Sequence, residues 1–197
     1  VQKGLGGFLV RNMESYGILD TMGLTSRIVL DANIYTMNNR AEAFWMKKGI
    51  LGDTVPLELN AKELVHRNNK NSELTVYGYT PMMVSVQCVQ KTMDHCNHAC
   101  VQYVLKDRYQ KEFRGVCSCE FCYNTIYNTL PTSLLKEKEK AEKLGVKAYR
   151  LSFTIETQQE TEKIVRAFVD VYLRGQKPDG QMQTEETTKG HFQRGVE

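Results

Sequence analysis

Six cysteines lie between residues 88 and 122, and the chain of 197 residues has no other cysteine. Thiolates are the ligands that zinc and iron–sulfur clusters prefer in proteins. Unliganded thiols gathered this closely would be prone to oxidation. The segment therefore predicts a site for a soft metal ion or an iron–sulfur cluster. The six residues are Cys88, Cys96, Cys100, Cys117, Cys119 and Cys122.

The spacing of these cysteines leaves two kinds of metal site open. Cys96-x3-Cys100 and Cys119-x2-Cys122 are joined by a predicted hairpin over residues 104–113, as in a zinc ribbon. Four thiolates around zinc make a closed structural site. The alternative is a [4Fe–4S] cluster of the cubane type, and the spacing alone does not choose between the two.

The ligands that we expect for either centre are four of the six thiols. His95 and His98 flank Cys96, and an imidazole is able to replace a thiolate, although loop histidines more often bind no metal. The expected ligand set is Cys88, Cys96, Cys119 and Cys122, with Cys100 and Cys117 as alternates.

The composition sets the class of protein. Three disulfides are typical of small secreted chains with cysteines spread along them, whereas here the rest of the chain has none. Hydrophobic residues make up 41% and charged residues 25%, a composition that can form an ordinary hydrophobic core without disulfide bonds. We therefore expect a reducing, cytoplasmic setting. The net charge of +3 excludes no class of partner, and no apolar run is long enough to span a membrane.

A repeated pattern predicts the fold: an apolar strand, a polar turn, and then a helix with an Asn or Thr cap and a Glu three residues later. Strands that alternate with helices indicate a parallel sheet. The strands predicted before capped helices are 28–35, 55–59 and 149–155, and the caps are Asn39, Asn60 and Thr157. Further strands are predicted at 8–10, 74–77 and 125–128. A further helix, with a solvated charged face at 136–140, is predicted after the 125–128 strand.

The predicted class is α/β, either an open doubly wound sheet or the later part of a TIM-like (β/α) barrel truncated at its N-terminal side. In both, ligands bind beyond the carboxyl ends of the strands. The expected parts are barrel units at 1–85 and 124–175, a cysteine-rich insertion at 86–123, and an irregular tail at 176–197.

Three motifs resemble those of peptidase family U-32, the collagenase-like proteases. They are Glu73-Leu-Thr-Val-Tyr-Gly78 with its continuation to Cys88, the segment Tyr123-Asn-Thr-Ile-Tyr-Asn-Thr-Leu-Pro131, and Gly190-His-Phe-x-Arg-Gly195. They occur in the family's order, and the resemblance runs from about Arg27 to the C-terminus. The family has cysteine and glycine where this chain has Pro81 and Val86, whereas Cys88 matches the second cysteine of the signature.

The resemblance implies a barrel-like core and, from the cysteine-paired hairpin, the longer subgroup of the family. Relatives of this kind use an iron–sulfur cluster to hydroxylate bases of ribosomal or transfer RNA, or a quinone precursor, without molecular oxygen. It therefore implies a [4Fe–4S] cofactor, an RNA partner, and Cys88 with the later thiols as ligands. The family name implies the alternative of a peptidase that acts on protein or collagen.

The residues themselves favour cluster chemistry over proteolysis. Neither G-x-S-x-G nor H-E-x-x-H occurs, and cysteines that bind a metal are not free nucleophiles. A third hypothesis is a zinc-stabilised module that binds RNA or protein. We expect an oligomer, or the remainder of a longer chain, as a further partner. The polar residues proposed to face the substrate are Glu58, Tyr77, Asn128, Arg150 and His191, with Arg194 beside His191 and with Asn60 expected to act as a helix cap.

Overall fold

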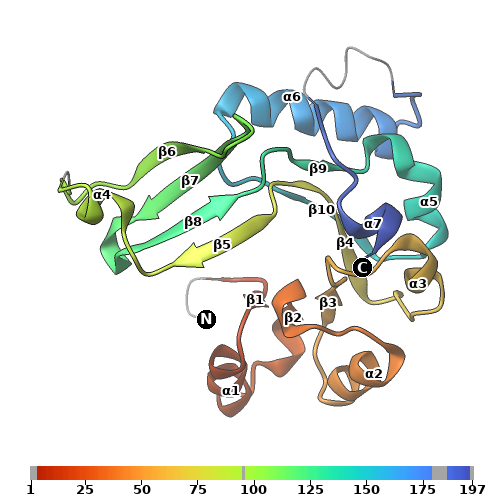
Figure 1. Ribbon diagram of the computed structural model, residues 1–197. Helices are drawn as coiled ribbons and strands as arrows, with labels where there is room; N and C mark the ends of the chain where they lie inside the picture. The colour runs from red at the N-terminus through yellow and green to blue at the C-terminus, as the bar shows by residue number, and fades with distance from the viewer. Residues whose placement is uncertain (1–3, 95, 179–185, 196–197) are drawn as a thin grey trace. The chain divides into compact units, whose positions relative to one another are not determined.

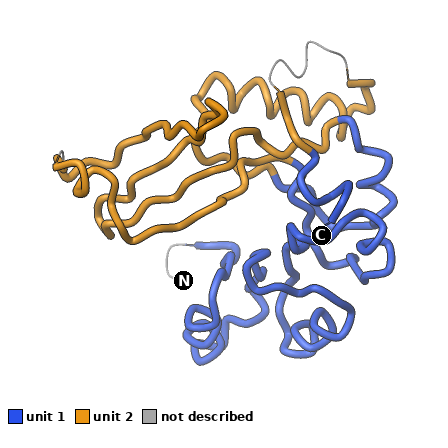
Figure 2. Tube along the Cα trace, in the orientation of Figure 1, with its two compact units in different colours: residues 1–76, 136–150, 189–197 blue, residues 77–135, 151–188 orange. Residues whose placement is uncertain are grey.

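The computed structural model describes residues 4–94, 96–178 and 186–195. The chain divides into two compact units, which Figure 2 shows in different colours. Unit 1 contains residues 1–76, 136–150 and 189–197, and unit 2 contains residues 77–135 and 151–188. Two strands, β4 and β10, continue from one unit into the other.

A curled parallel sheet organises unit 1 (Figure 1). Its strand order is β1-β2-β3-β4-β10, and β1 to β4 pair in parallel. Val10, Leu30, Asp53 and Ser72 lie opposite one another across the first four strands. The strands are β1 (Phe8–Val10), β2 (Ile28–Leu30), β3 (Gly52–Thr54), β4 (Ser72–Gly78) and β10 (Ala148–Ser152), and the short β9 (Thr132–Ser133) pairs antiparallel with β4.

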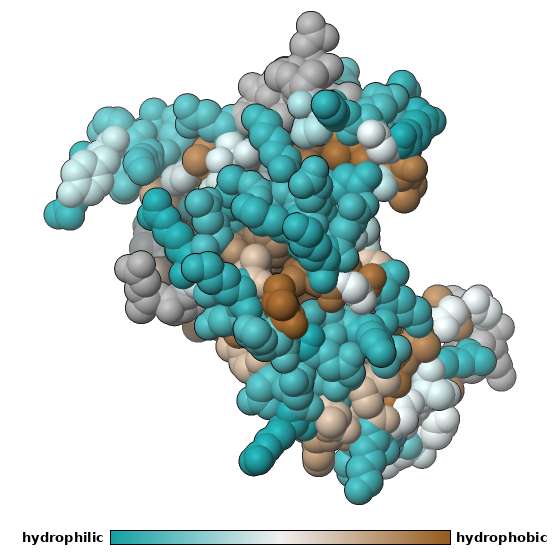
Figure 3. Space-filling view, turned by 90° about the vertical axis from the view of Figure 1, so that its right-hand side faces the viewer, coloured by the Kyte–Doolittle hydropathy of each residue, from teal (hydrophilic) through white to brown (hydrophobic). Residues whose placement is uncertain are grey.

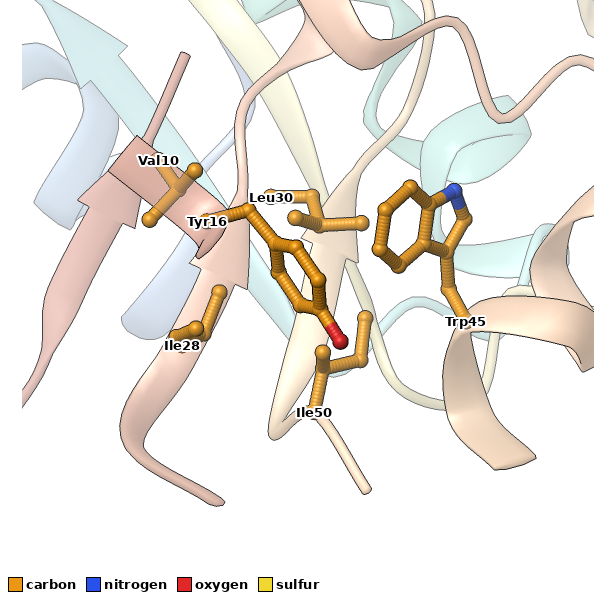
Figure 4. Packing of buried hydrophobic residues seen from close by; sticks show 6 residues of the cluster. All are labelled: Val10, Tyr16, Ile28, Leu30, Trp45 and Ile50. Carbon is orange, nitrogen blue, oxygen red and sulfur yellow. The ribbon is translucent and has the colours of Figure 1, made fainter. Parts of the chain in front are cut away.

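Apolar side chains between this sheet and its helices form the core of unit 1 (Figure 4). Tyr16 packs edge-on against Trp45 with 4.8 Å between ring centroids. Ile28 and Leu30 of β2 are fully buried, and Val10 and Ile50 complete the cluster. The helices of unit 1 are α1 (Met13–Thr21), α2 (Asn39–Lys47), α3 (Ala61–Val65), α5 (Lys138–Lys143) and α7 (His191–Arg194).

A buried ion pair joins β3 to the segment before β4. Arg67 pairs with Asp53, and both side chains are almost completely buried. The remaining polar groups are also bonded: Arg67 donates to Asn69 and to Ser72, and Ser72 donates to Asp53 at 2.6 Å. Because a buried pair is tolerated only when its other hydrogen bonds are made, this network fixes the geometry of the strand ends.

Unit 2 is built on an antiparallel sheet with the order β5-β8-β7-β6. A tight turn joins β6 to β7, where the Asp107 carboxylate accepts hydrogen bonds from the backbone N–H groups of Tyr109 and Lys111. The elements of unit 2 are β5 (Pro81–Ser85), α4 (Val89–Thr92), β6 (Val101–Lys106), β7 (Glu112–Ser118), β8 (Tyr123–Tyr127) and α6 (Gln158–Phe168), which continues as a π-helix (Val169–Leu173).

Several predictions from the sequence are confirmed at this level. The fold is mixed α/β with a parallel sheet, and the 104–113 hairpin is present in β6 and β7. Capping boxes begin α3 at Asn60 and α6 at Thr157, so Asn60 has the capping role expected for it. Among the described residues no closed TIM barrel forms, and none of their helices is long and apolar enough to cross a membrane.

Other predictions were wrong. The strand predicted at 125–128 belongs to the antiparallel sheet and not to the parallel one, because β8 pairs with β5 and β7. Residues 55–59 are not a strand, because Pro56 has no N–H to donate and the strand lies earlier, at Gly52–Thr54. A Cβ on Gly52 would lie 2.2 Å from the carbonyl oxygen of Asn71, so only glycine fits this approach.

Three smaller corrections concern helix starts and charges. The strand predicted at 28–35 ends at Leu30, where the Asp31 side chain starts a 3-10 helix. Asn38 caps α2 instead of Asn39. The 136–140 face is not wholly solvated: Glu137 is buried and pairs with Lys140 and Lys189. Burial raises the pKa of Glu137, but these two ammonium groups outweigh it and lower the pKa overall.

The tail predicted to be irregular contains a helix in its described part. Thr188 forms an isolated parallel bridge with Thr132, and Phe192 of α7 is buried. Residues 179–185, 196 and 197 of this predicted tail lie outside the described residues. On the face drawn in Figure 3, hydrophilic residues predominate and hydrophobic ones form patches between them, as is ordinary for a protein surface.

The capping box of α6 makes stability depend on pH in a predictable direction. Hydrogen bonding by the Thr157 backbone N–H is the largest cause that lowers the pKa of Glu160 below its ordinary value of 4.5. The carboxylate therefore contributes stability above pH 4.5, and that contribution is lost as pH falls through the lowered pKa. We expect Glu160→Gln to lower the free energy of unfolding by about 1 kcal/mol at neutral pH and by less in acid.

Urea unfolding of the full chain at several pH values measures this difference. Glu162→Gln, an exposed position on the same helix, serves as the control. A constant difference between Glu160→Gln and the unmodified chain at all pH values would contradict the capping argument.

Candidate metal centre

The cysteines come from four neighbouring segments of unit 2. Cys88 lies between β5 and α4, and Cys96 and Cys100 lie in the loop that leads from α4 to β6. Cys117 is on β7, Cys119 begins a short 3-10 helix, and Cys122 ends it before β8. In Figure 1, α4 and the β7–β8 turn lie at the same end of the antiparallel sheet. The sheet therefore brings together thiols that are up to 34 residues apart.

All six thiols are free, so the disulfide alternative is not realised. Cys88, Cys117 and Cys119 are buried together, whereas the other three are exposed. The Cys88 and Cys117 sulfurs are 3.5 Å apart, too far for a disulfide bond and close enough for a thiol hydrogen bond. The buried thiols form a floor, and the exposed thiols lie in the loops beside it.

Cys96, His98 and Cys119 form the tightest group of potential metal ligands. One ligand atom from each lies within 4.8 Å of the other two. Zn–S bonds of about 2.3 Å in a tetrahedron place sulfurs about 3.8 Å apart, so this spacing suits a single ion. His98 has φ of 55° and Cys122 has φ of 52°, conformations that are uncommon for residues with a Cβ.

The protonation of the thiols is uneven. Burial is the largest cause that raises the pKa of Cys117 to about 12, and the nearby Cys88 raises it further. The backbone N–H of Lys91, followed by the Cys117 thiol, lowers the pKa of Cys88. Cys88 is therefore the thiol of this pair that ionises first. A metal ion must displace the remaining protons, because only thiolates bind it strongly.

Cys119 lies within 4.8 Å of Cys96, and its pKa responds to all the other expected ligands. Burial raises its pKa most, and the neighbouring Cys96, Cys122 and Cys88 groups raise it further. The alternates are also near, since Cys100 acts on the pKa of Cys117. A donor set of soft sulfur atoms fits zinc or an iron–sulfur cluster. His95 lies outside the described residues.

Two of the polar residues proposed to face a substrate belong to unit 2. Tyr77 is buried on β4, where its ring packs against Phe153 and Phe168 at 5.5 and 6.1 Å between centroids. Its ring is thus part of the core. Asn128 follows β8, and its side chain accepts a hydrogen bond from the backbone N–H of Thr129.

The other three belong to unit 1. Arg150 forms ion pairs with Asp31 and Glu73. His191 Nδ1 lies 2.8 Å from the carbonyl oxygen of Gly195, within the turn that ends α7. The Glu58 atom Oε2 is buried and has no hydrogen-bond partner among the described residues. The five residues fall in two units. Arg194 is the last residue of α7, which begins at His191.

Sequence reasoning missed the partners of these residues. Asp31 and Glu73 carry the charge that Arg150 needs, and Arg11 adds a second ion pair to Asp31 at 2.9 Å. The position of Asp31 and Glu73 near strand ends in the sequence could have predicted that they pair with Arg150. Tyr103, which packs against the buried cysteines, had no signal beyond its place in the hairpin.

Comparison of the chain with protein-family models, with curated proteins and with solved structures finds no match in any of the three.

The cluster predicts that two exposed cysteines differ in their effect on metal content. We expect the anaerobically purified full chain to contain bound metal, Cys96→Ser to lose it, and Cys100→Ser to retain it, since Cys96 is in the tightest ligand group. Metal at about 1,000 times its dissociation constant stabilises a protein by about 4 kcal/mol.

Elemental analysis and thermal unfolding check this prediction. The Cys96→Ser variant should melt at the temperature of the metal-free chain, and Cys100→Ser at that of the unmodified chain. Equal metal content in both variants would contradict the assigned ligand set.

Proposed function

We propose that this chain is an iron–sulfur-dependent hydroxylase of RNA bases, of the kind that the resemblance to peptidase family U-32 implies. The observation that carries the proposal is that all six free cysteines come from segments of one antiparallel sheet, with α4 and the β7–β8 turn at the same end of it in Figure 1. Cys88, Cys96, Cys119 and Cys122 hold the cluster in this proposal. Bound there, a [4Fe–4S] cluster would supply electron transfer. With water as the oxygen source, conversion of a base C–H bond to C–OH releases two protons and two electrons, and the electrons would leave through the cluster to an external electron acceptor.

The protein residues have three tasks in this proposal. The thiolates hold and orient the cluster, and Cys117 together with Tyr103, which packs against the buried cysteines, keeps water from one side of it. The remaining task is to bind the base. Ribosomal or transfer RNA is the proposed partner, and a reducing compartment suits the free thiols.

The peptidase alternative has less support. Its only sequence-based candidate base, His191, directs Nδ1 at the Gly195 carbonyl, and the cysteines are engaged with one another. A cysteine protease needs a thiol whose pKa a neighbouring base lowers. Burial and the other thiols instead raise the pKa values of Cys117 and Cys119, and the pKa of Cys88 is lowered chiefly by the backbone N–H of Lys91 and not by an imidazole.

A zinc-stabilised module that binds RNA or protein is the second candidate, and one observation favours it. The 4.8 Å spacing of Cys96, His98 and Cys119 suits a single ion, whereas in a cubane each thiolate binds a different iron. Both candidates use Cys96 and Cys119, but the cluster adds Cys88 and Cys122 whereas the zinc site adds His98, and this difference makes them separable.

Two exposed positions distinguish the cofactors. We expect Cys122→Ser to lose iron and the visible absorption of the anaerobically purified chain, and His98→Ala to retain both. Elemental analysis and absorption spectroscopy measure the outcome. A colourless chain that contains one equivalent of zinc, together with loss of that zinc in His98→Ala, would favour the zinc module and contradict the hydroxylase.

The reaction itself is tested on RNA. Ribosomal and transfer RNA from cells that express the chain should contain a base heavier by one oxygen atom, absent when Cys119→Ser is expressed. Mass spectrometry of digested RNA detects it. Release of peptides from gelatin that survives Cys119→Ser, without any modified base, would favour the peptidase.

A further inference from the structure

Cys88 and Cys117 place two thiols in direct contact inside unit 2. Their sulfur atoms are 3.5 Å apart. Cys88 is 5% exposed, and Cys117 is fully buried. A disulfide bond holds its sulfurs about 2.05 Å apart, so a movement of about 1.5 Å would close this gap. Rotation of the two side chains about their Cα–Cβ bonds can supply a movement of that size. The pair is therefore one oxidation step away from a covalent link.

The backbone holds these two residues in place without a metal ion. Cys117 lies within β7, where it is opposite Val101 of β6 and Asn124 of β8. Cys88 precedes α4 as its N-cap residue, and the hydrogen bond from Asn124 to the carbonyl of Gln87 fixes the chain just before it. Because strand pairing and this hydrogen bond set both positions, the two sulfurs stay close in the metal-free chain.

The neighbouring thiols are less suited to pair with one another. The Cys122 thiol is directed at a backbone group, since its sulfur lies 3.7 Å from the carbonyl oxygen of Cys119. Cys96, which lies within 4.8 Å of Cys119, belongs to the loop between α4 and β6 and to no described helix or strand. We therefore expect oxidation of the metal-free chain to select the pair Cys88 and Cys117.

A peroxide is an oxidant small enough to reach such a pair. Hydrogen peroxide oxidises the thiol of Cys88 to a sulfenic acid, and one water molecule leaves. The thiol of Cys117 then attacks that sulfur, an S–S bond forms, and the sulfenic oxygen leaves as a second water. Two S–H bonds are broken, and the two electrons that the sulfurs lose end on the peroxide oxygens. Since the second thiol is 3.5 Å away, this step competes well with further, irreversible oxidation.

This disulfide would change what the metal centre is able to bind. Only thiolates bind zinc or an iron–sulfur cluster strongly, and a disulfide sulfur is not a thiolate. Cys88 is one of the four cluster ligands in the proposed function. Formation of the disulfide therefore removes a ligand, and reduction of the disulfide by a thiol restores it.

We propose that Cys88 and Cys117 are a redox-sensitive modification site, which a peroxide closes to a disulfide in the metal-free chain and which then prevents a cluster from being loaded. The disulfide itself rests on the distance between the sulfurs and on the strand pairing that maintains it. The effect on loading rests also on the proposed function, because that function makes Cys88 a cluster ligand.

Peptide mapping of the full chain tests the link directly. The metal-free, reduced chain is treated with hydrogen peroxide, its remaining free thiols are alkylated, and it is digested with trypsin. We expect the peptide 71–91, which contains Cys88, to be linked to the peptide 115–136, which contains Cys117. The linked pair should be lighter than the two reduced peptides together by about 2 Da, because two hydrogens are lost, and dithiothreitol should separate it.

Matched variants assign the link within the second peptide, which also contains Cys119 and Cys122. Cys117→Ala should abolish the link to 71–91, whereas Cys119→Ala should retain it. Because Cys117 is fully buried and its replacement risks misfolding, Cys88→Ala provides an independent check. In Cys88→Ala the peptide 115–136 should carry no link to another peptide after the same treatment.

Reconstitution with ferrous iron and inorganic sulfide tests the effect on loading. The oxidised chain should take up no iron above the background. The same chain reduced again with dithiothreitol should take up as much iron as a chain that was never oxidised. The link is mapped again after reconstitution, since sulfide is itself able to reduce disulfides.

The outcomes separate this inference from the proposed function. Oxidation that leaves Cys88 and Cys117 unlinked, or equal iron uptake by the linked and the reduced chain, overturns the switch whatever the RNA product shows. A link that blocks iron uptake in a chain that modifies no RNA keeps the switch and overturns the hydroxylase.

Discussion

The constraint on which the functional part of this protein depends is the clustering of its cysteines. The sulfurs of Cys88 and Cys117 are 3.5 Å apart, and Cys96 and Cys119 lie within 4.8 Å of each other and of His98. Burial and mutual repulsion oppose ionisation of Cys117 and Cys119, so the metal-free cluster holds protons that a bound ion must displace. The sheet tolerates this arrangement because its ladder, and not the sulfur contacts, holds the strands together. Six register pairs join β6 to β7 from Val101 to Lys106. The loops that carry the exposed cysteines are thus anchored before metal binds.

The order of strands in the antiparallel sheet explains why these segments meet. β8 lies between β5 and β7, so the chain after Cys122 returns beside the chain that enters Cys88. Asn124 strengthens this return by its hydrogen bond to Gln87, the residue before Cys88. One side chain therefore closes the sheet near the thiols.

The sequence predicted elements whose signals are local and failed where pairing is distant. Asn60 and Thr157 were recognisable as caps because a capping box lies within four residues. The clustering of the cysteines was equally evident from spacing. The sequence did not reveal to which sheet β8 belongs. Residues 125–128 are largely apolar or β-branched, and that character suits a parallel and an antiparallel sheet equally. The strand at Gly52–Thr54 was not predicted, because the close approach of Asn71 that requires glycine there comes from the residue before another strand, β4.

Arg150 illustrates why a polar residue near strand ends is not by itself catalytic. Its guanidinium pairs with Asp31 and Glu73, and Thr54 donates to the same Glu73 oxygen at 2.7 Å. These contacts connect Arg150 of β10 to Asp31 after β2 and to Glu73 of β4, and through Glu73 to Thr54 of β3. The side chains of Arg150, Asp31 and Glu73 are largely buried. A guanidinium with both branches occupied by carboxylates has little capacity left for a substrate anion. Within unit 1 the network therefore acts chiefly in holding the parallel strands together, while the thiols of unit 2 carry the chemistry proposed for this chain.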